Sequence, residues 1–196
     1  MFFKTCSVVL FAVSVTACAA RNRIDTTVAC EQLIHEEALV SDSTVGSLAG
    51  SYLLQVSAES GPQQGASTRA SLTLIAMPES LQTLYLTEDI PIEGAWAPFF
   101  GFSDMEPGKV GAVDTRPSVV ADSTRTDALV VASRNETGAY SIVIRLGTSA
   151  TGPQPIEGGY FVFDIKNISD QGFAGEWRSG MGNERVDGIF CAIRKE

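Results

Sequence analysis

The sequence predicts a mainly β protein: an antiparallel up-and-down barrel, or a barrel-like sandwich, of about seven or eight strands with one N-terminal helix. Two observations carry this prediction. From Gly50 onward, apolar residues recur at every second position in most segments, which is the period of a half-buried strand. Turns rich in Gly, Asn, Asp and Ser separate these segments at fairly even spacing. A barrel is favoured over a sandwich because closure removes exposed strand edges.

The only helix is expected over Val28–Val40, before the strands begin. Ala29 and Leu33, and then Ile34 and Ala38, recur at the four-residue spacing of one helix face. The segment therefore predicts one amphipathic helix.

The first two strands are expected at Tyr52–Ala58 and Arg69–Met77, as a hairpin with a long loop. A third, irregular strand is expected within Leu84–Ile92, where Pro91 limits pairing. Ser103–Asp127 has the poorest pattern and is interpreted as a long excursion. Regular strands are expected at Ala128–Ala132, Tyr140–Leu146, Gly159–Ile165, Phe173–Arg178 and Val186–Arg194, and the aromatic run Trp96–Phe102 is a further candidate strand.

The N-terminus carries an export signal. Lys4 precedes the apolar stretch Ser7–Val15, which is too short to span a bilayer as a permanent anchor. The stretch runs into Val15-Thr16-Ala17-Cys18, which resembles the lipobox of bacterial lipoproteins. The alternative is a plain secretory signal that ends near Ala17, Ala19 or Ala20, with Cys18 incidental.

The lipobox resemblance implies that residues 1–17 are a signal peptide and that the Cys18 thiol carries acyl chains such as palmitate. Residues 18–27 would then be a short lipidated tether and residues 28–196 a single β domain. Two or three acyl chains make a stable anchor, whereas one holds only reversibly. Ala19 follows the cysteine, and in lipoproteins of enteric bacteria a residue other than Asp there favours the outer membrane.

Two cysteines remain after Cys6 leaves with the signal and Cys18 is acylated. Cys30 and Cys191 are predicted to form one disulfide in an oxidising envelope compartment, which pins the N-terminal segment to the last strand. The alternative is two buried free thiols. No metal site is predicted, because neither cysteine has a CxxC partner and His35 is the only histidine.

The mature chain would be acidic. Loss of Lys4 changes the formal charge from −9 to −10. Such a body is repelled by nucleic acid and by anionic headgroups, so no nucleic-acid partner is expected and membrane binding must come from the acyl chains.

No sequence motif points to a catalytic site or a cofactor. The chain contains no GxSxG or SxxK, no calcium-binding loop and no phosphate-binding loop. A carboxylate-based hydrolase is the minor alternative, because acidic residues cluster around the aromatic run that begins at Trp96. These residues are Glu88, Asp89, Glu93, Asp104 and Glu106.

Aromatic residues suggest a candidate pocket for an apolar ligand, lined by Tyr52, Trp96, Phe163 and Trp177. The competing interpretation, that these side chains are simply the core, is the favoured one. Gly50-Ser51-Tyr52 at the start of the first strand, together with Arg194 at the end, is similar to the lipocalin or calycin pattern. That resemblance implies a barrel with a cavity for a small apolar molecule and an arginine packed across the first-strand aromatic.

The sequence therefore predicts a membrane-anchored envelope lipoprotein with a non-catalytic β domain that binds a small apolar ligand or a partner. A structural role, in which the domain docks to another envelope protein, is the alternative.

Overall fold

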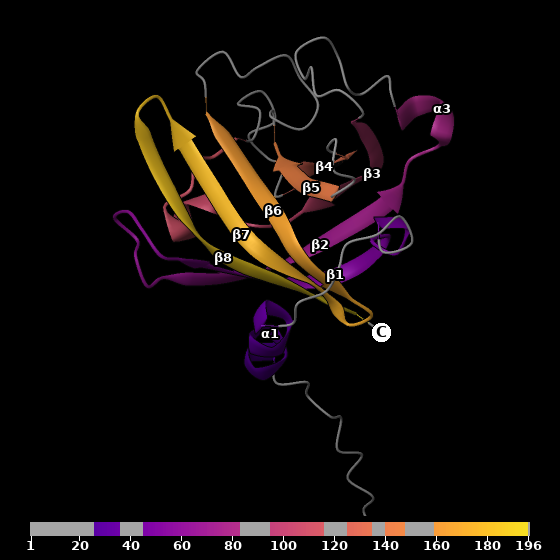
Figure 1. Ribbon diagram of the computed structural model, residues 1–196. Coiled ribbons are helices and arrows are strands. Elements are labelled where there is room, and N and C mark those ends of the chain that lie inside the picture. The colour runs from indigo at the N-terminus through magenta and orange to yellow at the C-terminus, as the bar shows by residue number, and fades with distance from the viewer. Residues whose placement is uncertain are drawn as a thin grey trace, which may run out of the picture.

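The fold is a closed eight-stranded antiparallel barrel (Figure 1). The computed structural model describes residues 26–35, 45–82, 95–115, 125–134, 140–147 and 159–195. Each strand pairs with the next one in sequence, and the last pairs with the first, so the expected barrel is formed rather than a sandwich. The strands are β1 (Gly50–Ala58), β2 (Ser67–Ala76), β3 (Trp96–Ser103), β4 (Thr126–Arg134), β5 (Tyr140–Leu146), β6 (Tyr160–Ser169), β7 (Gly172–Met181) and β8 (Glu184–Arg194).

Short helical segments accompany the barrel. They are α1 (Thr26–His35), α3 (Glu79–Gln82) and the 3-10 turn η1 (Pro107–Val110). The helix expected from residue 28 overlaps α1, and its second part from residue 36 lies outside the described residues. The irregular strand expected within Leu84–Ile92 also lies outside them. β2 pairs directly with β3 in the closed barrel.

Alternating side chains fill the barrel, as the period of two predicts. Tyr52, Leu54 and Val56 of β1 face inward and are fully buried, whereas the residues between them are partly exposed. Because one face of every strand is buried, a one-residue slip in pairing would expose the whole inward set, and this fixes the register.

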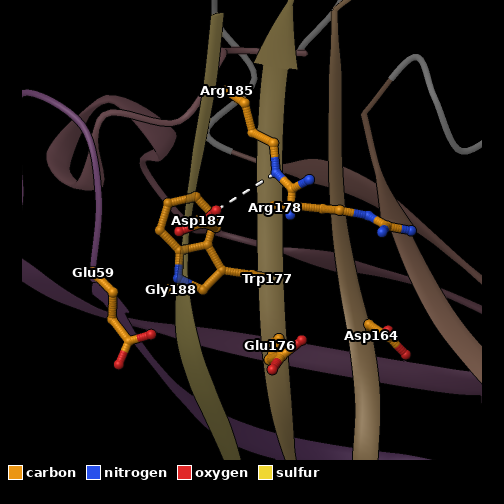
Figure 2. A pocket seen from close by; sticks show the side chains of 8 residues that line it. All are labelled: Glu59, Asp164, Glu176, Trp177, Arg178, Arg185, Asp187 and Gly188. Carbon is orange, nitrogen blue, oxygen red and sulfur yellow. Dashed lines mark ion pairs between the residues drawn. The ribbon is translucent and has the colours of Figure 1, made fainter.

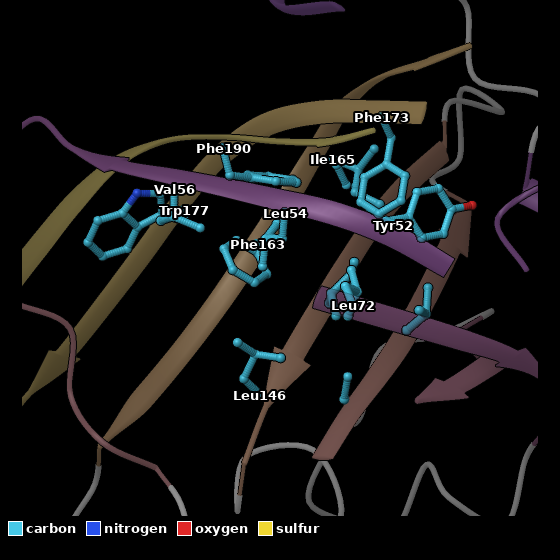
Figure 3. Packing of buried hydrophobic residues seen from close by; sticks show 14 of the residues in the cluster. Tyr52, Leu54, Val56, Leu72, Leu146, Phe163, Ile165, Phe173, Trp177 and Phe190 are labelled. Carbon is cyan, nitrogen blue, oxygen red and sulfur yellow. The ribbon is translucent and has the colours of Figure 1, made fainter. Parts of the chain in front are cut away.

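Aromatic rings occupy the side of the interior lined by β1, β6, β7 and β8 (Figure 3). They form an unbroken series of contacts from Tyr52 to Trp177. The centroid separations are 4.9 Å for Tyr52–Phe173, 6.1 Å for Phe173–Phe190, 4.6 Å for Phe190–Phe163, 5.1 Å for Phe163–Phe161 and 5.5 Å for Phe161–Trp177.

Residues 104–115, which follow β3, cover one end of the barrel, which we call the mouth end. Met105, Val110 and Ala112 are buried in the same core cluster as the barrel interior. The backbone N–H of Val113 donates to the Ser179 hydroxyl at 2.8 Å, and the Thr115 hydroxyl donates to the carbonyl of Leu146 at 2.8 Å. The pattern-poor excursion is thus partly a cap, held to the strands by hydroxyl groups.

Residues 45–49 cover the opposite end, which we call the closed end. Val45 and Leu48 are buried in the same core. Within the described residues, side chains therefore pack at both ends and along the aromatic side of the interior.

Candidate functional site

Arg194 and Tyr52 meet at the closed end as direct cross-strand partners of β8 and β1. The guanidinium carbon lies 5.0 Å from the centre of the Tyr52 ring, and Nη2 donates to the tyrosine hydroxyl at 2.8 Å. Gly50 makes room for this arrangement, because a Cβ there would approach Nη1 of Arg194 to 2.6 Å. The arginine that the calycin resemblance places across the first-strand aromatic thus contacts Tyr52.

The same pair fastens residues 45–49 to the barrel. Arg194 donates from Nη1 to the carbonyl of Ala49 at 2.9 Å and from Nη2 to the carbonyl of Ser47. The Tyr52 hydroxyl donates to the carbonyl of Leu48 at 2.8 Å. Burial raises the pKa of Tyr52, and the charge of Arg194 and its hydrogen bond offset part of that rise. The tyrosine therefore remains a neutral hydrogen-bond donor.

Three of the four residues of the predicted apolar pocket lie in the aromatic series of the interior, and the fourth packs against the same core. Phe163 and Trp177 are fully buried within the aromatic series, with Tyr52 at its other end. Trp96 is half-buried and lies edge-on to Tyr140, with ring centroids 6.2 Å apart. The indole Nε1 of Trp177 donates to the carbonyl of Ser57 at 2.8 Å. Tyr52, Phe163 and Trp177 thus belong to the packed core.

A disulfide joins Cys30 of α1 to Cys191 of β8, as expected, with Cα atoms 5.6 Å apart. Both sulfurs lie on the outer face of the barrel, where Cys30, Leu33, Ala174, Cys191 and Ile193 form a small buried cluster. The bond links segments 161 residues apart in sequence.

A charged pocket of about 230 Å³ lies beside the outer face of β6, β7 and β8 (Figure 2). Arg185 pairs there with Asp187 at 3.5 Å, and Asp164 pairs with Lys166 at 2.6 Å. These pairs are partly exposed, so each contributes little stability. The lining residues are Glu59, Asp164, Glu176, Trp177, Arg178, Arg185, Asp187 and Gly188.

The acidic cluster proposed for a hydrolase is only partly within the described residues. Asp104 accepts the backbone N–H of Ser71 at 2.5 Å, and Glu106 forms an exposed ion pair with Lys109 at 3.0 Å. Glu88, Asp89 and Glu93 lie outside the described residues. The two described carboxylates thus have structural partners.

No group of three or more His, Cys, Asp or Glu side chains is placed to hold a metal ion in the described part of the chain. Across the described segments, no helix has the length and apolar character needed to cross a bilayer. The lipobox residues and Cys18 lie outside these segments.

An apolar strip lies on the outer face of β2 and β3, and we define it as Ile75, Phe100 and Phe102. Ile75 and Phe100 are direct cross-strand partners and are 43% and 42% exposed. Phe102 is half-buried, with the guanidinium carbon of Arg125 3.4 Å from its ring centre. Scattered exposed apolar residues are normal, but a cross-strand pair beside a second aromatic residue is a continuous surface.

Sequence reasoning missed this strip and the cap at the mouth end. The signal for the strip was present: WAPFFGF has apolar residues at consecutive positions, so both faces of β3 had to carry some of them.

Comparison of the chain with protein-family models, with curated proteins and with solved structures found no match. The barrel and its surfaces are therefore the basis for a functional assignment.

Proposed function

We propose that the chain is an envelope lipoprotein, anchored by acyl chains on Cys18 and bound for the outer membrane, whose barrel docks a protein partner through its outer apolar strip. Of the two binding roles expected from the sequence, the second is better supported, because Ile75 and Phe100 form an exposed apolar pair and the aromatic side of the interior is closely packed.

The calycin likeness, which the Tyr52–Arg194 contact supports, does not by itself favour a ligand in the interior. An apolar molecule there would have to displace rings such as Phe163 and Phe190, whose centroids are 4.6 Å apart. Interiors packed to this degree tolerate little added volume. The barrel is better suited to serve as a rigid support for its outer surface.

The strip and its surroundings define the chemistry of the partner. Exposed carboxylates adjoin it: Asp127 lies opposite Phe102 across the β3–β4 pair, and Asp104 follows β3. The mature chain would carry a formal charge of −10. The partner should therefore present apolar side chains bordered by Lys or Arg, since charge complementarity speeds association and excludes wrong partners.

Acylation is tested by mass and by membrane association. We expect the intact chain from membranes to carry the mass of diacylglyceryl and to begin at Cys18, and Cys18→Ser to be released from the membrane fraction. A serine variant that stayed in membranes with unchanged mass would contradict the anchor.

Docking is tested by photo-crosslinking in cells. A photoreactive residue at position 100 should give a discrete adduct with one protein, and Ile75→Glu should abolish it by placing a charge in the strip. A photoreactive residue at Met181, which is 46% exposed on the β7–β8 hairpin, is the matched control and should give no such adduct.

Two further features separate docking from chance capture. The adduct should weaken as salt is raised, because screening reduces attraction between the acidic barrel and a basic partner. An adduct of equal yield from both positions, or one that survives Ile75→Glu, would overturn the proposal.

A further inference from the structure

We infer that the Cys30–Cys191 disulfide sets how far the barrel can stand from its membrane. The intact bond clamps α1 to the barrel and keeps the tether short. Reduction of the bond releases α1 and lengthens the tether. This inference rests on the proposed acylation of Cys18, whereas the clamping of α1 is independent of it.

Three contacts hold α1 on the outer face of the barrel. The disulfide joins it to β8, Leu33 packs into the cluster with Ala174 and Ile193, and Asn167 of β6 caps its last turn. The Asn167 side-chain amide donates to the carbonyls of Leu33 and Ile34, both at 3.1 Å. The helix is thus attached across β6, β7 and β8.

Without the disulfide these contacts are weak. A ten-residue helix is too short to be stable alone, so it depends on packing. Leu33 is its one large side chain described as buried, Ile34 is half-buried, and Glu31 and Gln32 are exposed. The surface beneath includes the small side chain of Ala174, which offers little area. Among the contacts described for residues 30–34, the covalent bond is therefore the main clamp on α1.

The chain is fastened to the barrel a second time, independently of the disulfide. Val45 and Leu48 are buried at the closed end, and Arg194 donates to the carbonyls of Ser47 and Ala49. Loss of the disulfide would therefore free the chain at most as far as this second attachment, with the barrel still closed by its strand pairs.

The two attachments give two tether lengths. Cys30 is 12 residues from Cys18, and Val45 is 27 residues from it. At roughly 3.4 Å per extended residue and 1.5 Å per helical residue from Thr26 to Cys30, the greatest reach from the acylated residue is about 33 Å with the disulfide closed. With the disulfide open and α1 unwound, it is about 90 Å. The bond thus more than halves the distance over which a partner can be met.

The redox step requires a dithiol, such as a reduced thiol-disulfide oxidoreductase of the envelope. Its thiolate attacks one sulfur and the S–S bond breaks. Its second thiol then resolves the mixed disulfide, leaving Cys30 and Cys191 as thiols and the reductant as a disulfide. Both cysteines are at most 5% exposed, so attack requires α1 to move first, and reduction should be slow.

The clamp is tested by hydrogen exchange on the full chain before and after treatment with dithiothreitol. Reduction should speed exchange of α1 amides about tenfold or more, while the amides of β1 and β8 remain protected. The Cys30→Ser, Cys191→Ser double variant should match the reduced chain without reductant. Asn167→Ala with the disulfide intact is the control and should keep most of the protection of α1.

The tether length is tested by energy transfer from a fluorophore at position 181 to labelled headgroups in phosphatidylcholine vesicles that carry the acylated chain. Transfer should drop on reduction and be equally low in the double serine variant. If reduction left the hydrogen exchange of the α1 amides unchanged, the clamp would be overturned. If reduction released α1 but left the energy transfer unchanged, the change in tether length would be overturned. A chain without acyl mass that fails to bind vesicles would instead refute the proposed function.

Discussion

At the residue scale, one cross-strand pair closes the barrel at the end formed by residues 45–49. Tyr52 and Arg194 come from the first and last strands, so their contact exists only when the barrel is closed. Each also binds backbone carbonyls of the segment before β1. The pair thus couples closure of the sheet to the position of the preceding chain.

Tyr52→Phe should lower the free energy of unfolding by about 1–3 kcal/mol, because it leaves the buried carbonyl of Leu48 without its donor. Urea denaturation at neutral pH measures this loss. Tyr160→Phe is a suitable control, since Tyr160 is only half-buried. If both variants lost the same free energy of unfolding, the hydrogen bond from the Tyr52 hydroxyl to Leu48 would not account for the loss.

The pKa of Tyr52 also gives stability a pH dependence. Burial raises its pKa above the ordinary value of 10.0, so the unfolded chain loses this proton first. The contribution is complete below about pH 10 and is lost as the pH rises through the folded-state pKa. The unfolding free energy should therefore fall more steeply above pH 10 in the native chain than in Tyr52→Phe. Equal slopes would contradict the assignment.

At the element scale, the pairing of β7 with β8 depends on a missing side chain. Gly188 lies opposite Trp177, and a Cβ at Gly188 would come within 2.0 Å of the Ser57 carbonyl oxygen and 2.7 Å of the indole Nε1. That space is where the indole reaches its hydrogen-bond acceptor on β1. The absence of a side chain at Gly188 thus lets Trp177 of β7 reach across β8 to the Ser57 carbonyl of β1.

Gly188→Ala should destabilise the barrel by about 1–3 kcal/mol through overpacking against backbone and indole. Chemical denaturation measures the change, and the tryptophan fluorescence of the native state should shift. Gly46→Ala is the matched control, because a Cβ at Gly46 meets nothing within 4 Å. If Gly188→Ala lowered the free energy of unfolding no more than Gly46→Ala does, this account would be contradicted.

At the scale of the whole molecule, the disulfide ties the first described helix to the last strand. It restricts the unfolded chain over 161 residues, for which loop-closure entropy allows at most about 5 kcal/mol. The barrel itself is closed by strand pairs all the way round, so it should survive loss of this bond.

The Cys30→Ser, Cys191→Ser variant should keep its β-sheet circular dichroism and melt at a lower temperature. For a domain of this size, each 1 kcal/mol corresponds to about 2–4 °C. Calorimetry of the variant and of the reduced native chain should give matching midpoints. Loss of the sheet signal at room temperature would show that the bond is required for the barrel.

Local pattern in the sequence predicted the class of fold and the pairing of Cys30 with Cys191. It also predicted β1 and β2 from alternation, β3 from its aromatic run, and the other five strands from apolar segments between turn residues. Alternation, turn residues and the count of available cysteines are properties of short segments or of simple elimination, so they can be read without knowing distant contacts. The sequence also placed Tyr52, Phe163 and Trp177 at inward positions. It left open whether they line a cavity or fill it.

Only the tertiary structure decided that these rings meet one another, that Met105 and Val110 return to cap the mouth end, and that Ile75 and Phe100 lie side by side on the outside. It also decided that Leu129 and Val131, which alternate with the inward residues of β4, are buried in a separate outer cluster. Each outcome depends on register and on volumes summed over strands far apart in sequence. Burial is a property of the assembled barrel, and no single segment carries that information.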